Sequence, residues 1–322
     1  MDGFFLHLSI ADWVNGALET FVAQYGDGFH RFSVLVLRYL LVPLEGALRA
    51  APPWLVLLVV GAIAWNATRH IGLGALFMLL LYAIGCFGLW DKLMQTLALM
   101  LVATVLSVAV GVPLGILASR SAWLRRMLLP VLDVMQTLPS FVYLIPVLML
   151  FGLGKVPAIL ATIIYALPPL IRLTDLGIRQ VDPDVTEAAR AFGTTRWQLL
   201  VNVQLPLARP SIMAGINQTT MMALSMVVIA SMIGSRGLGE DVLAGIQTLD
   251  VGKGTQAGLA IVILAIVIDR ISQGFGQERR ARRRLAQQRR QRGASRVPYR
   301  VPGKAASSAG VDSNQATQSS RA

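Results

Sequence analysis

The sequence has little cysteine, histidine or charge. Cys86 is its only cysteine, so no disulfide and no cysteine metal site can form within one chain. The three histidines are scattered, and we expect no metal site. Charged residues make up 14% of the 322 residues, against about a quarter in a typical globular protein. With a mean hydropathy of +0.61, this composition argues against a water-soluble enzyme.

The sequence contains several long apolar runs. About 20 mostly apolar residues cross the hydrocarbon core of a bilayer as a helix. The sequence predicts an all-α polytopic membrane protein with about seven transmembrane helices, in a membrane domain of residues 53–275. The predicted spans are 53–66, 71–89, 93–118, 128–151, 156–178, 207–234 and 256–275.

The formal net charge of +12 is unevenly distributed. Residues 276–322 contain twelve Lys or Arg and two acids, which gives +10, and the other residues carry only +2. Basic residues favour the cytoplasmic side of a membrane protein. We therefore predict an outside N-terminus and a cytoplasmic C-terminus, because the loops on the tail side are also the more basic ones.

The two ends of the chain differ from the membrane domain. Residues 1–52 are partly amphipathic and are predicted to form an extracytoplasmic, interfacial segment. Residues 276–322 are predicted to be a basic, largely disordered cytoplasmic tail. Its arginines could bind RNA, but no stacking aromatics are interleaved with them, so we expect contact with anionic membrane lipids and no nucleic acid.

One long loop, residues 179–206, lies on the predicted cytoplasmic side. Asp182 is suited to cap a helix that has Pro183 at its first position, and Gly193 is suited to end that helix. A second helix can begin at Thr194 or Thr195, and Pro206 is expected to mark a bend into the next span. The interpretation is a helix, a turn and a helix, although an ordinary surface helix would carry the same caps.

The spacing within this loop resembles the coupling loop of ABC importer permeases. The matching residues are Glu187, Ala188, Ala189, Gly193, Leu205 and Pro206. Val203 departs from the isoleucine common in that family. The runs at 136–144, 165–173 and 223–234 look like the permease subunit of glycine betaine, proline betaine and choline importers. The resemblance covers about residues 95–273.

This resemblance implies a type I ABC importer permease fold in the inner membrane of a bacterium. It implies a transport subunit that is not an enzyme and holds no cofactor, with ATP and Mg²⁺ bound by a separate cytoplasmic ATPase. An extracytoplasmic substrate-binding protein and a second copy of the permease, as a homodimer, are the other implied partners. The sequence agrees in one respect: it has no phosphate-binding loop, because Gly252-Lys253-Gly254 lacks the required preceding spacing.

Polar and aromatic residues inside the predicted spans are candidates for a translocation path, since aromatic faces attract methylated ammonium groups. Packing between helices is the competing explanation for such residues. Arg172 and Asp175 are three positions apart and can pair on one helix face. The candidates for the path are Asn217, Gln218, Thr219, Met222, Tyr143 and Phe141.

Other function classes remain open at this point. A permease for an amino acid such as methionine would share the loop signature. An ion-coupled secondary carrier would be expected to keep a charge near the middle of a span, and no predicted span has one. A membrane scaffold held by its basic tail would show no solute flux. The sequence does not rank glycine betaine, proline betaine, choline and carnitine, nor does it show whether osmolarity or nutrient supply controls activity.

Overall fold

We describe the protein from a computed structural model. The structure describes the backbone of residues 34–68 and 70–294 and of five isolated earlier positions, and side chains as far as Phe275. The chain divides into two compact units, Met1–Arg280 and Ala281–Ala322. Of the predicted interfacial segment 1–52, most of residues 1–33 lie outside the described residues, as do residues 295–322 of the predicted tail 276–322.

None of the described residues forms a strand, so the predicted all-α class is confirmed. The helices are η1 (Leu37–Leu41), α2 (Val42–Ala50), α3 (Pro53–Thr68), α4 (Ile71–Cys86), α5 (Trp90–Arg120), α6 (Ala122–Thr137), α7 (Ser140–Phe151), α8 (Lys155–Arg179), α9 (Pro183–Ala191), α10 (Arg196–Gln198), η2 (Leu199–Gln204), α11 (Leu205–Ala230), η3 (Ser231–Ser235), α12 (Leu238–Gln247) and α13 (Val251–Ala294), where η denotes a π-helix. Helix α13 thus continues into the predicted tail.

In the part of the chain that the structure describes, four helical segments are long and apolar enough to cross a membrane: Trp90–Arg120, Lys155–Arg179, Arg196–Ser235 and Val251–Phe275. Two bent pairs raise this number to six, and Ile71–Cys86 is a shorter apolar helix. Every predicted span therefore has a helical counterpart. The predicted span 128–151 is not straight, because α6 and α7 meet at 100°. Leu138 is extended there, as expected for a residue that precedes a proline, here Pro139.

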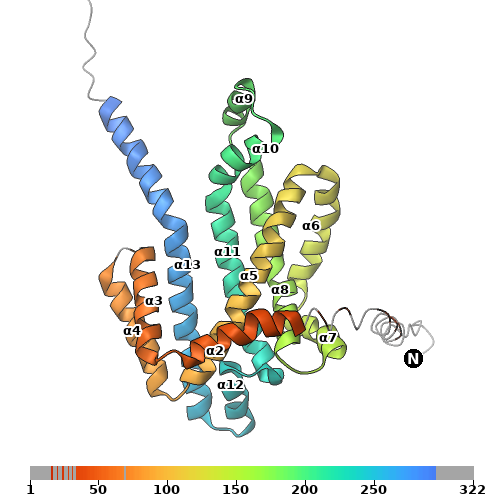
Figure 1. Cartoon of the computed structure of the whole chain (residues 1–322), viewed down its shortest axis with the longest axis vertical. Helices are drawn as coiled ribbons and strands as arrows, with labels where there is room; N and C mark the ends of the chain where they lie inside the picture. Colours follow the sequence, from red (N-terminus) through yellow and green to blue (C-terminus); the bar gives the residue numbers. More distant parts are fainter. Residues whose placement is uncertain are drawn as a thin grey trace, which may run out of the picture. The chain divides into compact units, whose positions relative to one another are not determined.

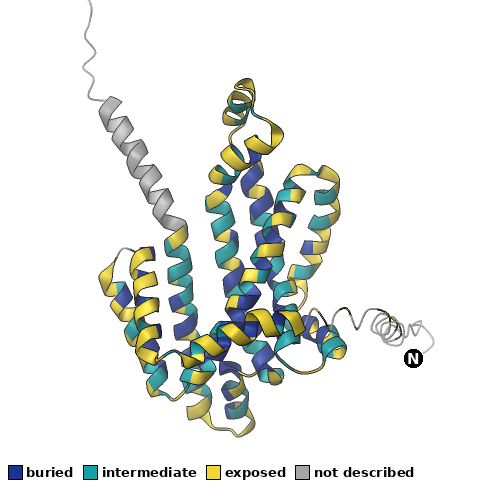
Figure 2. Cartoon of the chain, viewed as in Figure 1, coloured by how far each residue is buried: buried dark blue, intermediate teal, exposed yellow. Residues whose placement is uncertain are grey.

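Helices α5, α8 and α11 form the core of the membrane domain (Figure 1). These three helices carry most of the fully buried side chains of the described residues (Figure 2). Gly115 on α5 allows a close approach: a Cβ atom there would lie 2.5 Å from the Cβ of Thr174 and 2.9 Å from the carbonyl oxygen of Ile171 on α8. Small residues at helix crossings are typical of membrane packing, where backbone proximity supplies much of the attraction.

The loop between α8 and α11 lies at one end of this core, which we call the loop end (Figure 1). Helices α7 and α12 lie at the other end, which we call the opposite end. Helix α2 runs across the axes of the core helices near the opposite end and meets α3 at a bend of 109°. Its Glu45 is buried and forms an ion pair with Lys155 at the start of α8. Segment 34–50 is thereby attached to the core.

Candidate functional site

Helix α9 begins as the sequence predicts. The carboxylate of Asp182 accepts a hydrogen bond of 3.0 Å from the backbone N–H of Asp184, and Pro183 occupies the first turn. The cap satisfies a backbone donor that has no partner within the helix, and the Asp184 carboxylate lies at the positive end of the helix dipole. These local interactions fix the first end of the loop without help from the rest of the fold.

The end of α9 is also confirmed. Gly193 has φ = +80°, a conformation that side chains with a Cβ disfavour. Its N–H donates to the carbonyl of Arg190 at 2.9 Å, and Thr194 N–H donates to the carbonyl of Ala189 at 3.3 Å. The second helix then begins with a capping box between Thr195 and Gln198. The predicted helix, turn and helix are all present.

The structure does not show the bend that we expected at Pro206. The chain is helical from Arg196 to Met232, and a kink follows at Ile233 and Gly234. The segment Arg196–Ser235 is long and apolar enough to count as one span. A π-helical stretch, Leu199–Gln204, ends just before Leu205, and Pro206 falls in the first turn of α11. A proline in the first turn lacks only a donor that would be unpaired there. The loop end is therefore joined to α11 by continuous helix.

The outer face of this loop is exposed. Glu187 and Ala188 are exposed on α9, and Ala189 is half-buried. Phe192 is 89% exposed and Trp197 is 69% exposed. The spacing signature of the loop does not include these two aromatic residues, although an exposed aromatic side chain in a short polar loop is a signal for a contact surface. The loop thus exposes an acid and a small side chain on α9, together with two aromatic side chains that follow in the chain.

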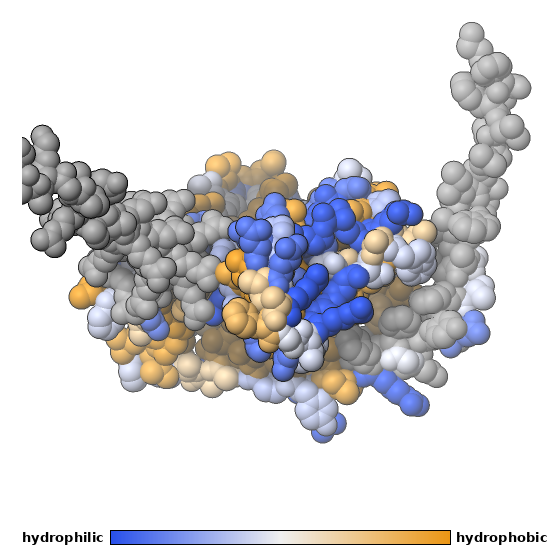
Figure 3. All heavy atoms as spheres, turned by 90° about the horizontal axis from the view of Figure 1, so that it is seen from above, coloured by the Kyte–Doolittle hydropathy of each residue, from blue (hydrophilic) through white to orange (hydrophobic). Residues whose placement is uncertain are grey.

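A basic hollow lies behind this face. It has a volume of about 640 Å³ and is lined by residues from the ends of α5 and α8 and from the loop itself. Four of the lining residues are arginines: Arg120, Arg179, Arg190 and Arg196. No carboxylate lines it among the described residues, although Arg179 lies 3.8 Å from Asp175. Hydrophilic side chains gather at this end of the molecule (Figure 3).

Helices α8 and α11, which flank the loop, pack tightly along their length. The buried hydroxyl of Thr219 donates to the carbonyl of Ala166 on α8 at 2.9 Å. A Cβ on Gly177 of α8 would lie 2.6 Å from the Cβ of Ser211, and one on Gly215 would lie 3.2 Å from the Cβ of Leu173. Close packing makes relative sliding of the two helices costly. A displacement of the loop must therefore move α8 and α11 together.

The residues predicted for the path on α11 face different ways. Thr219 is fully buried, and Asn217 donates to Asp269 of α13 at 3.3 Å. Met222 packs on the α5 core. Gln218 is exposed, and so is Ser225 two turns later. The structure thus places Gln218 and Ser225 on one unpartnered strip of α11 and turns Asn217 and Thr219 toward neighbouring helices.

The two aromatic residues of α7 that were candidates for the path differ in burial. Tyr143 is buried, its hydroxyl donates to the carbonyl of Met135, and its ring meets that of Tyr165 edge-on at 5.7 Å. Phe141 is 53% exposed. Tyr143 therefore holds α6, α7 and α8 together in this structure, and Phe141 points away from the core.

Charged residues of the membrane helices pair across helices. Arg172 on α8 binds Asp133 on α6. Asp175 lies 3.4 Å from Arg125 and 3.8 Å from Arg179. The pairing of Arg172 with Asp175 that their spacing allows is therefore wrong, because α6 supplies a partner for each. No group of three or more potential metal ligands occurs among the described residues.

Comparisons with known proteins give one consistent result. Residues 111–280 match the sequence profile of the family described as "Binding-protein-dependent transport system inner membrane component". The chain is 47% identical over 275 residues to the glycine betaine/proline betaine transport system permease protein ProW of Escherichia coli (strain K12), covering 85% of this chain and 77% of that one.

Two further relatives agree. The chain is 49% identical over 232 residues to the glycine betaine transport system permease protein OpuAB of Bacillus subtilis (strain 168), covering 72% and 82% of the two chains. It is 42% identical over 274 residues to the glycine betaine/carnitine transport permease protein GbuB of Listeria monocytogenes serotype 1/2a (strain 10403S), covering 84% and 96%.

Among solved structures, a chain of the MetNI methionine ABC transporter in an inward facing conformation superposes with a TM-score of 0.53. The identity is 22%, and the alignment covers 59% of this chain and 94% of that one. This likeness supports the predicted type I permease fold.

Proposed function

Because the chain belongs to the family of inner-membrane components of binding-protein-dependent transport systems, we propose that it is the permease subunit of an ATP-driven importer of quaternary ammonium osmoprotectants. Glycine betaine and proline betaine are proposed substrates because the names of the relatives above carry them, and choline is proposed because it shares their quaternary ammonium group. The observation that carries the proposal is the exposed loop face at Glu187 and Ala188, held by continuous helix on the tightly packed pair α8 and α11.

The proposed mechanical step starts at the loop end. A cytoplasmic ATPase, which holds ATP and Mg²⁺, binds the face of α9 that carries small side chains, between Glu187 and Gly193. Closure of the ATPase moves α9 and α10, and the displacement passes into α8 and α11 as a unit because these helices are bonded at Thr219 and closely packed at Gly177. Access to the path then alternates between the two sides of the membrane. ATP hydrolysis itself takes place on the partner.

Charge at the two ends supports a cytoplasmic loop end. Arg126, Arg190 and Arg196 have no ion-pair partner among the described residues at this end. At the opposite end, Lys92 lies 2.7 Å from Asp241 and Lys155 lies 2.6 Å from Glu45. Unneutralised basic charge favours the cytoplasmic side. We therefore assign α7 and α12 to the extracytoplasmic side, where a substrate-binding protein delivers the solute.

The exposed strip of α11 supports a second copy of the permease. Gln218 and Ser225 lie within a segment of membrane-spanning length and are exposed in the single chain. A polar side chain that faces lipid is costly, so such residues usually face another helix or a water-filled path. In a homodimer with this strip toward its centre, Gln218 and Ser225 would face the second copy and a water-filled path instead of lipid. The path then lies between two copies of α11, with lipids around the outside.

The test is transport by the assembled complex in proteoliposomes. Labelled glycine betaine and choline should enter only with ATP, the ATPase and the binding protein present, and labelled methionine should not. Ala188→Trp should abolish uptake because its bulk prevents close approach of the ATPase to α9. Val262→Trp, at an exposed position in the middle of α13 and away from the loop, is the control. Methionine uptake, or normal betaine uptake by Ala188→Trp, would refute the proposal.

A further inference from the structure

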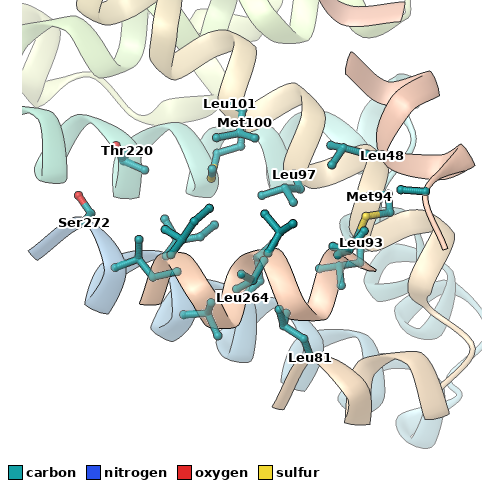
Figure 4. Close-up of a pocket in the computed structure, with 18 of the residues that line it drawn as sticks. Leu48, Leu81, Leu93, Met94, Leu97, Met100, Leu101, Thr220, Leu264 and Ser272 are labelled. Carbon is teal, nitrogen blue, oxygen red and sulfur yellow. The ribbon is translucent and has the colours of Figure 1, made fainter. Parts of the chain in front are cut away.

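An apolar cavity separates the α3–α4 hairpin from the core of the membrane domain (Figure 4). Its volume is about 480 Å³, and it is lined by residues of α3, α5 and α13 together with single contributions from α2, α4, α11 and the link between α2 and α3. The hairpin is attached to α13 beyond both ends of this cavity. Gln256 donates to the carbonyl of Phe87 at 2.8 Å, and a Cβ on Gly274 would lie 2.8 Å from the carbonyl oxygen of Ala67.

The cavity is elongated along the helices. Leu48 and Met94 lie toward one end of it, and Thr220 and Ser272 lie toward the other (Figure 4). Its lining on α5 runs from Leu93 to Thr104, which corresponds to about 16 Å at the helical rise of 1.5 Å per residue. Three α3 residues that line it, Leu55, Val59 and Ile63, are 41–49% exposed. The cavity therefore opens sideways beside α3. Because it lies along the membrane-spanning helices α5 and α13, this opening faces the hydrocarbon core of the bilayer.

The chemistry of the lining does not suit water or peptide along most of the length of the cavity. Hydroxyl groups occur only at Thr104, Thr220 and Ser272, and the Thr220 hydroxyl already donates to the carbonyl of Ile216. A buried water needs two to four polar partners. An extended peptide would bring backbone N–H and C=O groups without partners, and a helix of about 10–12 Å diameter needs more room than this volume gives over that length.

We propose that an acyl chain of a membrane lipid occupies this cavity and forms part of the contact between the α3–α4 hairpin and the core. A hydrocarbon chain carries no hydrogen-bonding group and can enter from the side beside α3. Its contacts replace the dispersion attraction that an empty cavity would lose. The proposal rests on the membrane placement of the chain and is independent of the transported solute.

The test is photolabelling of the full-length chain in vesicles of phosphatidylglycerol that carries a diazirine midway along one acyl chain. Labelled residues are located by mass spectrometry. We expect labelling of buried α5 residues such as Met100, which is 1% exposed and lines the cavity. Val60→Phe fills the cavity from α3 and should cause loss of this label. Val262→Phe, at an exposed position of α13 outside the lining, is the matched control and should retain it.

Three outcomes would overturn the proposal. Met100 is unlabelled in the unaltered chain, or its label persists in Val60→Phe, or it becomes labelled only after deletion of residues 1–33. The last outcome would mean that the chain's own N-terminal segment occupies the cavity. If Val60→Phe does not fold, Ile268→Phe fills the same space from α13 and gives the same test.

Discussion

The ammonium nitrogen of Lys155 lies 2.6 Å from both carboxylate oxygens of Glu45. This pair joins α2, which comes before the predicted spans, to the first turn of α8. Arg49 extends the contact, because it lies 3.6 Å from Glu45 and 2.5 Å from Asp91 at the start of α5. Helix α2 is therefore fixed to two of the three core helices, α5 and α8, at the opposite end.

Loss of this pair should destabilise the protein. Lys155→Met leaves the buried Glu45 carboxylate with a weaker partner, and we expect a loss of roughly 2 kcal/mol. The loss stays below the roughly 3–5 kcal/mol typical of a broken buried pair, because Lys155 is partly exposed. Thermal unfolding of the purified protein measures it. Lys253→Met is the control, because Lys253 is more exposed and lies 3.8 Å from Asp241; equal shifts for the two variants would contradict the prediction.

The crossing of α5 and α8 should not tolerate a methyl group at Gly115. Gly115→Ala places a Cβ 2.9 Å from the carbonyl oxygen of Ile171, so the two backbones must separate. We expect a destabilisation of roughly 1–3 kcal/mol, as for other overpacked sites, and reduced uptake. Gly72→Ala on α4 has no atom within 4 Å of the added methyl and should be neutral or slightly stabilising. Equal stability of the two variants would show that the crossing is not limited by this contact.

The turn after α9 should depend on the left-handed conformation of Gly193. Gly193→Val places a β-branched side chain at φ = +80°, which costs more than the roughly 1–2 kcal/mol typical of ordinary residues there. We expect normal membrane insertion with ATP hydrolysis uncoupled from uptake. Gly193→Asn should retain most coupling, because asparagine tolerates this conformation. Space does not limit the site, so equal effects of the two variants would argue against backbone strain as the cause.

Accessibility to a membrane-impermeant thiol reagent should separate neighbouring residues of α11. In a Cys86→Ser background, which removes the only native cysteine, Gln218→Cys and Ser225→Cys should react in the assembled transporter if their strip faces a water-filled path. Thr219→Cys should not react, because the residue is fully buried against α8. Reaction at position 219, or protection of both 218 and 225, would contradict the proposed strip.

Local signals in the sequence predicted much of the loop. The Asp182 cap, the Gly193 turn and the second helix start at Thr195 each depend on residues within five positions of one another. Such interactions form in the same way in many folds, so the sequence suffices to predict them. The continuous helix through Pro206 was not predicted, because a proline alone does not show whether a π-helical stretch precedes it.

Interactions between helices were harder to predict. Short helix α12 was not recognised because it is only ten residues long and amphipathic; its Leu238 N–H donates to the Thr96 hydroxyl on α5 at 3.0 Å. Arg172 forms its ion pair with Asp133 on another helix and not with the neighbouring Asp175. Each of these contacts depends on the rotation and depth of a second helix, and no local pattern specifies either.

The amino-acid sequence determined the chemical class of this protein: its hydrophobic run lengths indicate a membrane protein, and the spacing from Glu187 to Pro206 resembles the coupling loop of a permease. These are properties of composition and of near neighbours, and they hold however the helices pack. Tertiary structure alone decided which polar side chains bind neighbouring helices, as Asn217 and Thr219 do, and which remain exposed, as Gln218 does. The direction of a side chain is set by the close packing of α8, α11 and α13 against one another, and that packing depends on the whole set of contacting surfaces.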